Sequence, residues 1–281
     1  MKTLLLTLAL IAGLFLSFGS ERAQTDQGSV TPSIAQVKHL KDFQVVEFRR
    51  YTIKEGERAH FAQYFESYFP EAFEQLGAIA VGTFFERNDP SHFTWIRAFH
   101  TMDDRAKINA EFYYGPLWRE HASTLNKLMT DSDNVLLLKS LRPEHGLTIY
   151  PAVDPVTETK GAQGVVVAQI FAVKEKSVDG FLQGAEPIFA SYRAAGVREA
   201  GLLVSFEGSN NFPQLPVRTD GPHLLWLGIL RDDADFENRL KPLMDHAVEP
   251  LSGTGLLRTA PELVVLDPTH RSRLRWLPEG D

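Results

Sequence analysis

The sequence predicts an α+β fold in which two tandem ferredoxin-like βαββαβ repeats pair their sheets into one α/β barrel within the chain. The first observation behind this prediction is an internal repeat. Four residues of the first half recur in the second half at a single offset of 131: Asp89/Asp220, His92/His223, Trp95/Trp226 and Asp104/Asp235. The second observation is that strand-like and helix-like patterns follow the same order in both halves. The third is physical. Such a unit has helices on one face of its sheet only, so the other face needs cover, and a second repeat can supply it.

The first repeat is expected to span residues 43–143. Its expected elements are strands at 45–53, 78–86, 93–100 and 135–141, and helices starting at 55 and 101. Pro70 lies inside the first helix and predicts a kink, and Gly77 is a suitable residue to end it. Thr101 with Asp104 resembles a capping box, and Gly115-Pro116 must interrupt the second helix.

The second repeat is expected to span residues 164–268. Its expected strands are 164–173, 197–207, 223–231 and 263–266, and its expected helices are 177–195 and 232–248. The loop 208–222 is about ten residues longer than its counterpart in the first repeat. A segment rich in Pro, Thr and Gly at 144–163 reads as a linker, and residues 269–281 form a C-terminal tail.

The N-terminus carries a targeting pattern. Lys2, a short apolar run and the small residues before Ser20 predict a signal peptide at 1–19, followed by a disordered linker at 20–42. We therefore expect a periplasmic or secreted protein with no transmembrane segment once the signal is removed. An uncleaved N-terminal anchor is the alternative. The net charge of −7 argues against nucleic acid and anionic membranes as partners, and the absence of Cys means that no disulfide supports the fold.

Searches for reactive motifs give no positive result. There is no phosphate-binding glycine loop, no nucleophile elbow and no thiol, and His60 lies in a lone Glu-x-x-His without a second copy. We therefore expect no metal and no cofactor. His60, His100 and His121 are interpreted as surface or core-edge histidines, with a haem ligand or a general base as the alternative.

The first repeat resembles a known family. Val45–Gly56, Phe93–Phe99, Phe112–Trp118 and Asp131–Leu138 are similar to segments of the NIPSNAP family, and the resemblance covers roughly residues 43–143. It implies an exported bacterial type with two repeats and a fold of the dimeric α/β-barrel superfamily. The second half resembles the family only in pattern. Members of that superfamily range from cofactor-free oxygenases to haem enzymes, so the resemblance implies little chemistry.

The polar residues of the first repeat gather on one face of its sheet. Because side chains alternate along a strand, one face carries five candidate ligand-binding residues: Glu47, Arg49, Tyr51, Trp95 and Arg97. We expect this face to point into the barrel, with Ile96 and Ala98 under the helices. Buried charges need partners, so Glu47 is expected to pair with Arg49 or Arg97. At offsets of 122 and 131 the second repeat has no such charges: Gln169, Phe171, Val173, Trp226 and Gly228.

Two interpretations of this group remain open. It is either an interior ion pair that fixes the register of the sheets, or the wall of an aromatic pocket with few polar groups, which is typical of small-molecule sites. Tyr113 and Trp118 flank the helix break and complete the candidate ligand-binding set, although they could equally be packing that stabilises the break.

Three classes of function remain. The first is binding of a small apolar or aromatic ligand in a barrel pocket. The second is a cofactor-independent oxygenase or isomerase, which the resemblance implies by analogy of fold. The third is a protein-interaction scaffold without a small-molecule site, and a homo-oligomer is compatible with each.

Overall fold

The computed structural model describes residues 38–39 and 42–279. The predicted signal peptide and most of the predicted linker 20–42 lie outside the described residues, so export stays a prediction. Within that linker, Lys38–His39 (β1) pairs antiparallel with Thr148–Ile149 (β6) in a small two-stranded sheet.

The two halves contain the same order of elements. The first half runs β2 (Val45–Ile53), α1 (Arg58–Tyr68), α2 (Pro70–Leu76), β3 (Ile79–Glu86), β4 (His92–Phe99), α3 (Met102–Tyr113), α4 (Pro116–Leu128) and β5 (Met129–Ser140). The second half runs β7 (Val165–Ala172), α5 (Val178–Ala194), β8 (Arg198–Ser205), β9 (His223–Leu230), α6 (Asp233–Asp235), a π-helical turn (Phe236–Leu240), α7 (Lys241–Gly253) and β10 (Glu262–Pro268). A 3₁₀ turn at Pro143–His145 lies between them.

Local sequence signals explain where the helices of the first half begin and end. Pro70 starts α2, so the predicted kink is a full interruption, and Gly77 ends α2 in the left-handed region with φ of 100°. Pro116 starts α4 directly after Gly115, as the sequence predicts. Thr101 caps α3, because its Oγ1 accepts a hydrogen bond from the backbone N–H of Asp104 at 3.1 Å.

Removal of this cap gives the first prediction. Thr101→Ala is expected to lower the free energy of unfolding by about 1 kcal/mol, since one N–H of the first turn loses its acceptor. Denaturant titration measures the loss. Thr259→Ala, at an exposed threonine outside any helix, is the control and should stay within about 0.5 kcal/mol of the wild type. Equal losses in both variants would argue against the capping role.

Eight strands close into one antiparallel barrel in the order β10-β3-β4-β2-β5-β8-β9-β7. Each half contributes four neighbouring strands, and its last strand pairs with the second strand of the other half, at β5–β8 and β10–β3. Arg50 of β2 stabilises the junction between β10 and β3, because it pairs with Glu86 of β3 at 2.6 Å and with Glu262 of β10 at 2.6 Å. The predicted fold class is confirmed. Closure of the barrel needs no second chain, because the two sheets of one chain cover each other.

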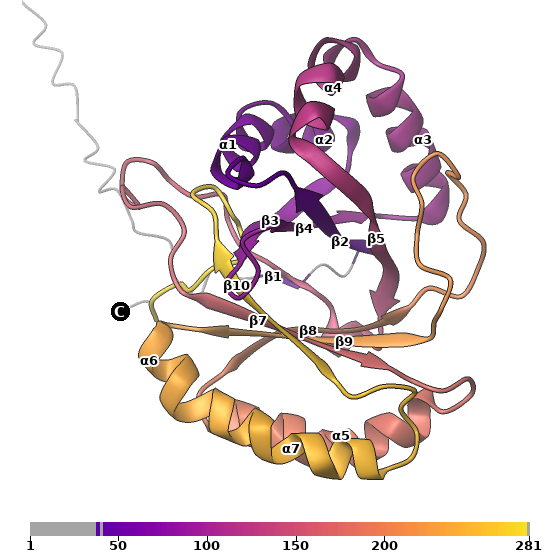
Figure 1. Cartoon of the computed structure of the whole chain (residues 1–281), viewed down its shortest axis with the longest axis vertical. Coiled ribbons are helices and arrows are strands. Elements are labelled where there is room, and N and C mark those ends of the chain that lie inside the picture. Colours follow the sequence, from indigo (N-terminus) through magenta and orange to yellow (C-terminus); the bar gives the residue numbers. More distant parts are fainter. Residues whose placement is uncertain (1–37, 40–41, 280–281) are drawn as a thin grey trace, which may run out of the picture. The chain divides into compact units, whose positions relative to one another are not determined.

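The barrel interior is filled by apolar side chains, most of them aliphatic, from both halves. Val46, Phe48, Ile96 and Ala98 of the first half belong to one buried cluster with residues of β7 and β9 such as Ala168, Ile170, Leu225 and Leu227. The opposite strand faces pack against helices, α1–α4 in the first half and α5 with α7 in the second. Figure 1 shows these two helical layers on opposite sides of the strands.

The segments between and after the repeats pack against this barrel. Leu274 and Leu277 of the predicted tail are buried in the same apolar cluster as Val46 and Ile96. Arg275, also in the tail, pairs at 2.7 Å with Glu158 of the predicted linker. Among the residues that the structure describes, none forms a helix of the length and apolarity needed to cross a bilayer.

Candidate functional site

The predicted polar face lies under the helices of the first half and not inside the barrel. Tyr51 and Trp95 belong to the buried cluster that includes Phe61, Phe65 and Phe73 of α1 and α2. Two predictions are therefore wrong. The candidate residues do not point into the barrel, and the predicted ligand pocket does not lie inside it; these residues are Glu47, Arg49, Tyr51, Trp95 and Arg97. The physical reason is size. An eight-stranded barrel has room only for packed side chains, here apolar and mostly aliphatic ones, whereas the layer between sheet and helices accommodates guanidinium groups among aromatic rings.

Glu47 lies at the centre of three arginines. Its Oε2 accepts hydrogen bonds from Arg49 Nη1 at 2.8 Å and from Arg97 Nε at 2.6 Å. Its Oε1 accepts one from Arg105 Nε of α3 at 2.6 Å. All four side chains are at most 1% exposed. The predicted pairing of Glu47 with Arg49 or Arg97 is confirmed for both, and Arg105 is a third partner that the sequence did not indicate.

The charges of this cluster act on one another. Burial alone would raise the pKa of Glu47, but the charges of Arg97, Arg49 and Arg105 outweigh it and hold that pKa well below its usual range. Burial lowers the pKa of Arg105, and repulsion from Arg97 and Arg49 adds to that effect against the attraction of Glu47. Burial raises the pKa of Tyr113, so its hydroxyl stays protonated at neutral pH.

Beside the cluster is a small aromatic cavity of about 70 Å³. Five of the seven predicted ligand-binding residues line it: Arg49, Tyr51, Trp95, Tyr113 and Trp118. The remaining two, Glu47 and Arg97, lie next to it. Arg97 donates to the Tyr113 hydroxyl at 3.4 Å, and its guanidinium carbon is 5.0 Å from the ring centre of Trp95. The structure therefore brings the predicted residues together, including Tyr113 and Trp118 at the helix break.

Several polar atoms of this region lack a partner. Trp95 Nε1, Arg97 Nη2 and Arg105 Nη2 are buried and make no hydrogen bond with any described residue, and neither side-chain polar atom of Asn109 on α3 makes one. Buried donors are normally satisfied, because an unpaired one costs about 1–3 kcal/mol. Trp95 lines the small cavity and Arg97 contacts Tyr113 of its wall, so these two unsatisfied donors indicate a site prepared for hydrogen-bond acceptors.

The second half contains no equivalent site. Strand pairing places Arg97 opposite Glu47 in the first half and Gly228 opposite Val167 in the second. The counterpart of Glu47 is therefore Val167, at an offset of 120, which corrects the predicted offset of 122. A side chain at Gly228 would meet the Trp226 ring at 2.3 Å, so no arginine fits there. The indole N–H of Trp226 also has an acceptor, Glu199 Oε2 at 3.1 Å.

The long loop 208–222 of the second half covers the site of the first half. Asn210 and Asn211 accept hydrogen bonds through their Oδ1 atoms from Arg105 Nη1, at 3.0 and 2.9 Å. Phe212 is buried with its ring centre 6.2 Å from that of Tyr113, and Leu215 lines the cavity. Figure 1 shows this orange loop running alongside α3.

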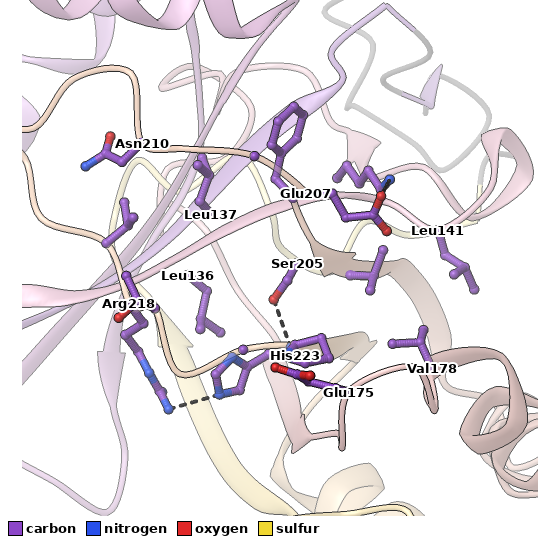
Figure 2. A pocket seen from close by; sticks show the side chains of 18 of the residues that line it. Leu136, Leu137, Leu141, Glu175, Val178, Ser205, Glu207, Asn210, Arg218 and His223 are labelled. Atoms are coloured by element: carbon purple, nitrogen blue, oxygen red, sulfur yellow. Dashed lines mark hydrogen bonds and ion pairs between the residues drawn. The ribbon is translucent and has the colours of Figure 1, made fainter.

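A larger cleft of about 800 Å³ lies on the other side of this loop, between β5, β8 and the start of α5. Figure 2 shows two hydrogen bonds among the polar groups that line it. Arg218 Nη2 donates to His223 Nε2 at 3.0 Å, and Ser205 Oγ accepts from the backbone N–H of His223 at 2.8 Å. Although this cleft is larger, the small cavity is the stronger candidate site, because there the buried donors are unpaired.

Sequence reasoning missed Arg105, Asn210 and Asn211. Arg105 lies on the inner face of α3 with Ile108 and Phe112, so a charged residue on a buried helical stripe was an available signal. The additional length of the 208–222 loop was a second signal, because long loops are often functional. Neither signal names the contact partner.

The described part of the chain contains no cluster of three or more His, Asp or Glu side chains placed to hold a metal ion. No curated protein matches this chain at a significant level.

The fold is that of α/β-barrel proteins made of two ferredoxin-like units, with both units in one chain. Solved structures share it. An anthrone oxidase-like protein superposes with a TM-score of 0.56 at 13% identity, covering 87% of this chain and 100% of its own. A proposed monooxygenase from Fusobacterium nucleatum gives 0.54 at 7% identity, covering 85% and 99%. Another from Lactobacillus acidophilus gives 0.51 at 14% identity, covering 80% and 94%.

The family is identified by sequence over the first half. Residues 46–141 match the NIPSNAP family model, so this part of the chain is a NIPSNAP domain. The predicted resemblance over residues 43–143 is confirmed. The matched residues include Glu47 and its three arginine partners. Asn210 and Asn211 of the covering loop lie outside the match.

Proposed function

We propose that the NIPSNAP domain binds a small aromatic ligand in the cavity between its sheet and its helices. The observation that carries this proposal is the convergence of buried, unpaired donors on an aromatic wall: Trp95 Nε1 and Arg97 Nη2 beside Tyr51, Tyr113 and Trp118. An apolar wall with a few placed polar groups is the usual composition of a small-molecule site.

The cavity must enlarge to receive a ring. Its volume of about 70 Å³ is roughly half of the ~150 Å³ that accommodates benzene in an engineered protein cavity. Leu215 of the covering loop 208–222 lines the cavity outside any helix or strand, and Tyr113 and Trp118 of its wall flank the helix break at Gly115.

Titration with three small aromatic probes tests the proposal. Phenol, benzamide and benzoate are added separately, and we expect at least one to shift the backbone amide resonances of Trp95, Tyr113 and Trp118. Leu215→Trp, which fills the cavity from the loop side, should abolish these shifts. Leu256→Trp, at a half-buried leucine of the second half, is the matched control and should preserve them. If no probe shifts these resonances, the proposal is wrong.

A cofactor-independent oxygenase is the second candidate function. It is supported by the fold shared with proposed monooxygenases and an anthrone oxidase-like protein. We rank it after binding because fold alone does not imply chemistry. Two titratable groups of the cavity wall are also unsuited to act as a base at neutral pH, since Arg49 stays charged and Tyr113 stays protonated. Oxygen consumption that depends on a bound probe and is lost in Leu215→Trp would reverse this ranking.

A further inference from the structure

We propose that the ligand of this site carries an anionic oxygen group, a carboxylate or a phenolate on an aromatic ring, which binds at Arg97 and Arg105 in the place now covered by Asn210 and Asn211. This inference rests on the proposed function and names the chemical class of its ligand.

The first argument is charge. Three buried guanidinium groups surround a single carboxylate, Glu47, and both of its oxygens are already used. A buried cation without a counterion is costly. The hydrogen-bonded cluster therefore has an excess of positive charge that one or two ligand oxyanions would neutralise.

The second argument is the geometry of the free donors. Arg97 Nη2 and Arg105 Nη2 are buried without partners, and their Nε atoms both bind Glu47. Each guanidinium thus binds the protein carboxylate through Nε alone, and its Nη2 donates to no described residue. Charge-assisted hydrogen bonds to carboxylates are about twice as strong as neutral ones, so an anion gains more from these donors than a neutral ligand does.

The third argument is the position of the asparagines. Two neutral amide oxygens, from Asn210 and Asn211, occupy Nη1 of Arg105 at 3.0 and 2.9 Å. Oxygen acceptors therefore already fit at this guanidinium, but they bring no charge. A ligand oxyanion would make the same kind of contact and also supply the missing negative charge.

The covering loop is also the wall between two spaces. Leu215 lines the small cavity, whereas Asn210 lines the larger cleft and is seen at its edge in Figure 2. Displacement of residues 210–215 would connect the cavity with the cleft and would free Arg105 in the same movement. The small volume of the cavity would then no longer exclude an aromatic ring, because the ring could extend toward the cleft of about 800 Å³.

The test compares benzoate with benzamide, which match in size and differ in charge. On the full chain, benzoate is expected to bind at least about tenfold more tightly than benzamide. Asn211→Asp places a carboxylate beside Arg105 and should weaken benzoate about tenfold or more, while benzamide stays unchanged. Gln214→Asp adds the same charge at another exposed position of the loop and is the control. Asn211→Ala removes an acceptor without adding charge and should leave benzoate binding at least as tight as in the wild type.

The outcomes separate the two proposals. If both probes bind at Trp95 and Tyr113 with equal affinity, the proposed aromatic site is retained and the proposed preference for an anionic ligand is wrong. Equal effects of Asn211→Asp and Gln214→Asp would place the anion away from Arg105 and overturn the inference. If neither probe binds, the site and its anion both fail.

Discussion

Glu47→Gln is expected to lower the free energy of unfolding by about 3–5 kcal/mol. The substitution keeps the size of the side chain but removes the only carboxylate among the described residues that pairs with Arg49, Arg97 and Arg105. Since these guanidinium groups are at most 1% exposed, solvent cannot replace the lost charge. Denaturant titration with a circular dichroism readout measures the effect. Glu207→Gln, whose side chain is 90% exposed, is the matched control and should change stability by less than about 0.5 kcal/mol.

This variant also decides between a structural and a ligand-binding role for the cluster. A loss below about 1 kcal/mol would mean that water reaches the arginines, and the dry ion cluster would be the wrong description. Removing one arginine together with Glu47 is not expected to restore stability, because two unpaired guanidinium groups would remain. A simple buried ion pair would be rescued by such a double substitution.

The pH dependence of this effect has a definite sign. Because the pKa of Glu47 is depressed in the folded protein, its contribution to stability is present above the unfolded pKa of about 4.3 and is lost as the pH falls. The difference between the wild type and Glu47→Gln should therefore be constant near neutral pH and shrink in acid.

The sequence predicted which residues share a face but not which way that face points. Side chains alternate along a strand, so Glu47, Arg49 and Tyr51 share one face of β2, and Trp95 and Arg97 share one face of β4. The observed pairing of the two strands places Arg97 opposite Glu47 and Trp95 opposite Arg49. Both faces of these strands are apolar enough to be buried, because each strand has the barrel on one side and helices on the other. The choice between them depends on the space available in each layer, which is a property of the assembled barrel.

The contacts that complete the site were beyond sequence reasoning for a different reason. Arg105 meets Asn210 and Asn211 across 105 and 106 residues of chain, and these pairs lie in different halves. No periodicity links such positions. Only the additional length of the 208–222 loop distinguished it from its counterpart, and length does not reveal where a loop packs.

His223 carries the second large effect, because it is buried in the neutral form. Burial, followed by the charge of Arg218, lowers the pKa of His223 from 6.5 to about 4, against the opposing charges of Asp220 and Glu262, while Arg258 adds to the lowering. His223 is 1% exposed, and its Nε2 accepts a hydrogen bond from Arg218, which a protonated ring could not do.

Acidification from about pH 7 to about pH 4 is therefore expected to remove about 3 kcal/mol of stability through His223 alone. The unfolded chain binds a proton at His223 near pH 6.5, whereas the folded protein binds it only near pH 4. This contribution is thus fully present above pH 6.5, declines between the two values and changes no further below about 4.

In His223→Gln, where an amide oxygen can still accept from Arg218, this part of the pH dependence should disappear. His246→Gln, at an exposed histidine, should retain it. If His223→Gln kept the full slope between pH 6.5 and 4, another group would be responsible and the neutral, buried state of His223 would be wrong. Since the Glu47 contribution fails only at lower pH, urea titrations at pH 7, 5 and 3 separate the two groups in one series.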